Sequence, residues 1–115
     1  MTNPMKGEVE VQLGDKSYSC RLTLDSLIKI ETALDTGILK IAQNMAEGNV
    51  RLSDVISILL PALRGGGNDL QQKDVIKIVE EVGIVRSTVV AAELLASTIS
   101  DPQGETEGKK PETKA

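Results

Sequence analysis

Two short stretches near the start of the chain alternate apolar and polar residues. In residues 7–13 and again in residues 17–22, every second residue is apolar. Side chains of an extended strand point to opposite faces in turn, so each stretch predicts a half-buried β-strand. Gly14-Asp15-Lys16 lies between them and is typical of a tight turn. The pattern predicts a β-hairpin over residues 7–22, with its apolar face formed by Val9, Val11, Leu13, Tyr18, Cys20 and Leu22.

After the hairpin, apolar residues recur every three or four positions, which is the spacing of amphipathic helices. Thr23 is a suitable N-cap for the first helix, and Gly37 is suited to end it. Pro61 falls inside the third helix and should kink it or end its regular part near Leu60. The predicted helices span residues 23–36, 38–47, 53–64, 71–82 and 84–100.

These elements predict an α+β fold in which an N-terminal β-hairpin packs on a small bundle of about five helices. Two strands alone are not stable in water, so the hairpin must lie on helices or pair with another chain. Residues 7–100 are expected to form a single α+β domain. Residues 1–6 are expected to be a disordered lead. Residues 101–115 carry no large apolar residue and are expected to be a disordered C-terminal tail.

Composition excludes several classes of partner. Tyr18 is the sole aromatic residue, so the core must be aliphatic. The net charge is −4, the basic residues form no cluster, and base-stacking aromatics are missing, which argues against nucleic acid. No apolar run approaches the length of a membrane span, and the first residues lack a signal-peptide pattern. We therefore expect no membrane partner and a cytoplasmic location.

The chain offers little for catalysis or metal binding. It contains no histidine, which removes the commonest general base and metal ligand. Cys20 faces inward on its strand and has no histidine to activate it, so a small buried hydrophobe is favoured over a nucleophile. We expect no enzymatic activity, no cofactor and no metal.

A run of glycines and a group of acidic residues also favour structural interpretations. Gly65-Gly66-Gly67 lacks the lysine and Ser/Thr of a phosphate-binding loop, so a flexible connection is predicted. Four acidic residues near the hairpin lack the spacing of a calcium loop and are interpreted as a solvated face. They are Glu8, Glu10, Asp15 and Asp25.

Glu31 lies on the apolar side of the first helix, between Leu27 and Leu34. It could be a buried carboxylate of functional importance. The favoured interpretation is an edge residue that bonds to the hairpin or to a neighbouring helix end, because charged residues are rarely buried without a partner.

The last helix, residues 84–100, is apolar around most of its circumference. A single narrow polar stripe contains Arg86, Glu93, Ser97 and Ser100. Such a helix is either buried as core or carries a second apolar surface for a partner, and the sequence leaves both open. The predicted partner-binding residues are Ile84, Val85, Val89, Ala92, Leu95, Ala96 and Ile99.

The order and spacing of these features resemble a known family. The matching features are Asn3-Pro4, Gly7-Glu8-Val9, the Thr23 cap with Leu27 and Ile30-Glu31, Gly37, Leu52-x-Asp54, Leu63-Arg64-Gly65, Glu81-x-Gly83 and Ala91 to Leu95. Over residues 3–96 the chain resembles the gene-transfer-agent family of small phage proteins, which is grouped with phage tail assembly chaperones. The family usually has an aromatic residue where this chain has Leu24, and the helix around Pro61 also differs.

The resemblance implies a non-enzymatic chaperone of phage or prophage tail assembly. Its expected partner is the tape measure protein, with the tail tube protein as a further partner and self-association left open. A chaperone should be absent from the mature virion. The alternative is a structural component retained in the virion, such as a tube or terminator subunit, whose hairpins would pair edge to edge.

Overall fold

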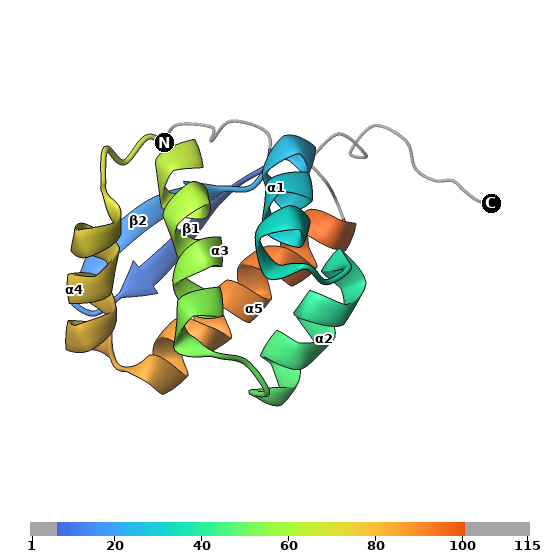
Figure 1. The fold of residues 1–115 in the computed structure, drawn as a ribbon. Helices are drawn as coiled ribbons and strands as arrows, with labels where there is room; N and C mark the ends of the chain where they lie inside the picture. Colours follow the sequence, from blue (N-terminus) through green and yellow to red (C-terminus); the bar gives the residue numbers. More distant parts are fainter. Residues whose placement is uncertain (1–6, 101–115) are drawn as a thin grey trace.

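The computed structural model describes residues 7–100 and places an antiparallel hairpin ahead of five helices (Figure 1). The predicted α+β architecture is therefore confirmed. The predicted lead and tail, residues 1–6 and 101–115, lie outside the described residues. The elements are β1 (Glu8–Leu13), β2 (Lys16–Arg21), α1 (Leu24–Leu34), α2 (Ile38–Glu47), α3 (Leu52–Gly65), α4 (Gln72–Val82) and α5 (Ile84–Ser100).

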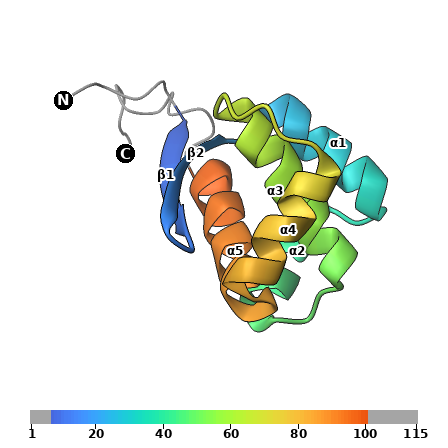
Figure 2. The same cartoon turned by 90° about the vertical axis from the view of Figure 1, so that its left-hand side faces the viewer.

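The hairpin forms the one sheet in the described part of the chain. Its register pairs Leu13 with Lys16 across a two-residue turn. Gly14 begins that turn at a φ of 71°, a conformation that glycine adopts without steric cost. Val11, Leu13 and Cys20 are buried against the helices, as the alternation predicts. The hairpin lies on one side of the bundle and α1 on the other (Figure 2).

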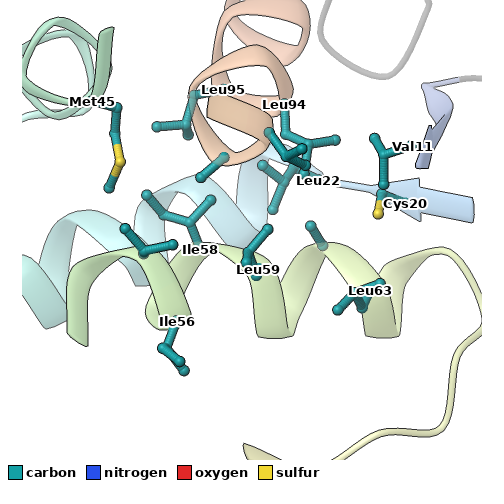
Figure 3. Close-up of a cluster of buried hydrophobic side chains, with 14 of the residues drawn as sticks. Val11, Cys20, Leu22, Met45, Ile56, Ile58, Leu59, Leu63, Leu94 and Leu95 are labelled. Carbon is teal, nitrogen blue, oxygen red and sulfur yellow. The ribbon is translucent and has the colours of Figure 1, made fainter. Parts of the chain in front are cut away.

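The centre of the bundle is α3, which contacts β2, α1, α4 and α5. Its inward face buries Val55, Ile58, Leu59, Ala62 and Leu63, several of which appear in Figure 3. The helix continues past Pro61 to Gly65, so the expectation that its regular part ends near Leu60 is wrong. Pro61 lies on the face turned away from this core, where a lost backbone hydrogen bond costs least, and the packing of Ala62 and Leu63 holds the last turn.

The end of α3 packs closely on the outer edge of β2. A Cβ atom at Gly66 would overlap the carbonyl oxygen of Ser19, and one at Gly65 would overlap that of Arg21. Asn68 Nδ2 also donates a hydrogen bond to the Ser19 oxygen at 2.7 Å. Gly65 and Gly66 therefore form a packed contact rather than the predicted flexible connection, because only residues without a side chain let the two backbones approach this closely.

Helix termini differ from the predicted ones by small amounts. Thr23 is the N-cap of α1, as predicted, and its Oγ1 accepts a hydrogen bond from the Ser26 amide at 3.1 Å. The helix ends earlier than predicted, because Asp35 takes up the left-handed conformation at a φ of 53° and closes it. Gly37 is instead the N-cap of α2 and has no side chain with which to cap it.

Glu31 supplies the missing cap from a neighbouring helix. Its Oε2 accepts a hydrogen bond from the Ile38 amide at 2.8 Å, at the first residue of α2. A carboxylate in this position satisfies a free amide and interacts favourably with the positive end of the helix dipole. The structural interpretation of Glu31, a bond to a neighbouring helix end, is confirmed.

Replacing Glu31 with alanine should lower the free energy of unfolding by about 1 kcal/mol, the usual contribution of a helix N-cap. Urea denaturation followed by circular dichroism would measure it. Glu47→Ala is the matched control, because Glu47 is exposed and makes only a 3.4 Å contact with Gln43 Nε2. Equal effects of the two substitutions would show that Glu31 does not act as a cap.

Cys20 is fully buried on β2, and burial raises the pKa of its thiol to about 12. In an unfolded chain a thiol has a pKa of about 8.5. At pH 8 the native protein should therefore react with a disulfide reagent roughly a thousandfold more slowly than the urea-unfolded chain. Stability should decline as pH rises from about 8.5 toward 12, because only the unfolded chain then loses the proton. Rapid labelling of the native protein at pH 8 would contradict the burial of Cys20.

Candidate protein-interaction site

The structure separates the seven predicted partner-binding residues of α5 into three groups. Val85, Ile84 and Val89 are 78 %, 57 % and 41 % exposed, and Ala96 is exposed as well. Ala92 and Ile99 are half-buried. Leu95 is fully buried and cannot meet a partner, so its assignment to the surface is wrong.

Leu95 belongs to the inward face of α5. Its side chain points into the space between Met45 of α2 and Ile58 of α3 (Figure 3). Apolar residues occupy 10 of the 17 positions of this helix and lie around most of its circumference, so the two apolar faces run together and only the packing separates them. The buried residues of α5 are Ser87, Val90, Ala91, Leu94, Leu95 and Thr98.

Three exposed and two half-buried apolar residues of α5 form a single line along the helix, which we call the outer row. It consists of Val85, Val89, Ala92, Ala96 and Ile99. Arg86 and Glu93 lie beside it on one flank and are exposed. Arg86 also donates a hydrogen bond through Nη2 to the carbonyl oxygen of Gln12 at 3.3 Å, which ties the helix to β1.

A second apolar surface is a groove of about 1320 Å³ with α3 as its floor and α1 and α4 as its walls. In Figure 1, α3 runs between these two helices. We call this surface the central groove. Its apolar lining includes Ile30, Leu52, Ile56, Leu60, Pro61, Ile76, Val79 and Ile84.

The central groove is largely apolar, with a few charges among its lining residues. Lys29 contributes from α1, where its Nζ is 3.2 Å from Asp25 Oδ2. Arg64 and Glu80 contribute from α3 and α4, and Arg64 Nε donates to the Leu70 carbonyl at 2.8 Å. The floor and walls of the central groove offer apolar side chains from three helices. The groove can therefore accept an amphipathic helix with its apolar face inward.

The sequence did not reveal the central groove. Its lining comes from three helices that are separated in sequence, and from α5 only Ile84 takes part. Leu52 and Ile76 are 45 % and 41 % exposed in the structure, but helical spacing in the sequence does not distinguish them from core residues. The predicted α5 surface and the groove meet only at Ile84.

Residues 7–100 contain no group of three or more His, Cys, Asp or Glu side chains that could hold a metal ion. In the same range no single helix is long and apolar enough to cross a membrane. The pair α4 and α5 would meet the length and composition criteria together, but the two helices are bent by 118°.

Comparison with known proteins gives one match. The family model described as "Phage tail tube protein, GTA-gp10" matches residues 6–101, which is most of the chain. Comparisons with curated proteins and with solved structures returned no match. The family match agrees with the gene-transfer-agent resemblance of the sequence, and its description names a tube protein rather than an assembly chaperone.

Proposed function

Because the chain belongs to the phage tail tube protein, GTA-gp10, family, we propose that it is a non-enzymatic structural subunit retained in the tail tube. The family match is the observation that carries this proposal. It favours the structural alternative over the assembly chaperone that the sequence resemblance placed first. The subunit would be made in the cytoplasm of the bacterial host and would then join the growing tail.

The surface of the molecule supports a role in assembly. A tube subunit must contact neighbours on more than one side, and exposed apolar patches commonly mark such contacts. Among the described residues, the outer row of α5 and the central groove are such patches. Both are built on helices, so their shape is held by the core that lies beneath them.

The hairpin is a poorer candidate for the contact between subunits. The outer edge of β2 is covered by Gly66 and Asn68, which lie on the Ser19 carbonyl. On β1 the Gln12 carbonyl already accepts a bond from Arg86, and the exposed Glu10 places a charge on the strand. Charged and covered edges disfavour strand pairing between molecules. We therefore expect subunits to meet through helices rather than through hairpin edges.

Immunogold labelling of purified particles tests the tube proposal. An antibody raised against the folded protein should label tails along their length, and particles from a strain that lacks the gene serve as the negative control. Labelling confined to one tail end would indicate a terminator-like subunit. Tails that carry no label after mild detergent treatment would contradict retention in the tail.

The central groove favours a second function, that of an assembly chaperone for the tape measure protein. A long amphipathic helix that is exposed before assembly would aggregate, and a groove lined by aliphatic residues can cover its apolar face. The groove offers such a lining over α1, α3 and α4. Many copies could coat one long helical partner, so each contact could be weak and still effective.

Co-expression with the tape measure protein tests this second function. Ile76→Asp places a charge in the groove, and Ile28→Asp is the matched control, because Ile28 is 60 % exposed on α1 and does not line the groove. If the groove covers the partner, Ile76→Asp should leave most of the tape measure protein insoluble, whereas the control should keep it soluble. If the tape measure protein is equally soluble with the wild-type chain, with either variant and without this chain, the chaperone function is ruled out.

A further inference from the structure

The outer row of α5 has the spacing of a helix–helix seam. Its members Val85, Val89, Ala92, Ala96 and Ile99 are separated by four, three, four and three residues. This is the 3.5-residue repeat by which two helices stay in contact along their length. We propose that α5 pairs antiparallel with α5 of a second copy of this chain. The inference rests on the geometry of α5 and holds whether or not the tube proposal is correct.

The sizes of the side chains favour a second copy in the antiparallel direction. Along the row, two valines are followed by two alanines. An antiparallel pair can place Val85 against Ala96 of the partner subunit and Val89 against Ala92 of the partner subunit. Each large residue then meets a small one, which is the arrangement that fills an interface without voids. A parallel pair would set valine against valine and alanine against alanine, and would leave gaps at the alanines.

The charges beside the row select the same arrangement. Arg86 and Glu93 lie on one flank of it, two helical turns apart and too distant to pair within one helix. In the antiparallel register described above, Arg86 lies near Glu93 of the partner subunit, and the two-fold symmetry repeats this pair. Shifting the helices by one heptad in either direction would bring Glu93 against Glu93 or Arg86 against Arg86. Opposite charges on such flanking positions set orientation and register.

The segment that follows α5 does not offer a better occupant. Residues 101–115 follow α5 directly but contain no large apolar residue, so they cannot cover the valines. Because alanines occupy two of the five positions, the interface is small, and small interfaces give weak, concentration-dependent association. We therefore expect a monomer–dimer equilibrium in solution.

Sedimentation velocity over a hundredfold range of concentration tests the pairing. The wild-type protein should shift from monomer toward dimer. Val89→Lys should abolish the shift, because it places a charge in the centre of the seam. Leu39→Lys is the matched control: Leu39 is 68 % exposed on α2, outside the outer row, and this variant should still dimerise. A wild-type protein that stays monomeric throughout, or a Val89→Lys variant that dimerises normally, would overturn the proposal.

Exchanging the charges of Arg86 and Glu93 tests the register without replacing any apolar residue of the outer row. Arg86→Glu alone or Glu93→Arg alone should weaken the dimer about tenfold, since each sets like charges against each other at two symmetric positions. The double variant Arg86→Glu with Glu93→Arg should recover the wild-type association. It does not restore the bond from Arg86 to Gln12, so recovery reports on the contact between copies. A double variant weaker than both single variants would overturn the antiparallel register.

Discussion

Replacing Gly66 with alanine should lower the free energy of unfolding by about 3 kcal/mol, at the upper end of what overpacking costs in a rigid site. The added methyl group would overlap the carbonyl oxygen of Ser19 in the β2 backbone, which cannot rotate away as a flexible side chain could. Relief requires that α3 and β2 move apart. That movement would break the bond from Asn68 Nδ2 to the same oxygen.

Urea denaturation of Gly66→Ala and of the wild type gives this difference directly. Gly37→Ala is the matched control, because a Cβ atom there meets nothing within 4 Å. It should lose less than about 1 kcal/mol, since alanine is a poorer N-cap than glycine. If both variants unfold at the same urea concentration, the close approach of α3 to β2 is not a feature of the folded protein.

Replacing Leu95 with alanine should lower the free energy of unfolding by about 3 kcal/mol, because it opens a cavity in a well-packed core. Leu95 is fully buried between α2 and α3. A surface residue devoted to a partner would give the opposite result, with little loss of stability and a large loss of association. The substitution therefore distinguishes the observed placement from the one predicted by the sequence pattern.

Val85→Ala provides the comparison on the same helix. Val85 is 78 % exposed, and its removal should change the free energy of unfolding by no more than about 0.5 kcal/mol. Thermal and urea unfolding of both variants should be measured at low concentration, where dimers do not contribute. A Leu95→Ala variant as stable as Val85→Ala would contradict the inward placement of Leu95.

Much of the fold followed from local patterns. The alternation in the hairpin and the repeat in the helices specify which face is apolar, and those faces are the ones that the structure buries. Val11, Leu13 and Cys20 on the strands are examples, as are Leu27 and Ile30 on α1. These predictions succeed because each depends on residues that are neighbours in sequence.

One feature that escaped prediction depends on a contact between distant segments. Gly65 and Gly66 at the end of α3 look like a loose connection until Arg21 and Ser19 of β2 are placed beside them, and this contact has no signature in the local sequence. The end of α1 was missed for a local reason, because Asp35 takes a conformation more often assigned to glycine.

The candidate site was predicted only in part, because its surfaces depend on how separate helices pack. The sequence identified α5 as a helix with more apolar surface than a core requires, and most of its outer row is indeed exposed. The sequence pattern does not separate the buried face of α5 from the exposed one, and so Leu95 was assigned to the wrong face. The central groove could not be predicted, because it exists only where α1, α3 and α4 meet.

Quantitative mass spectrometry of purified particles tests the central claim, that this chain is a retained subunit of the tail tube. We predict peptides from residues 7–100 at many copies per particle, in a constant ratio to the other tail proteins across independent preparations. Absence of these peptides from particles, while the protein is abundant in the lysate of the producing cells, would contradict the claim.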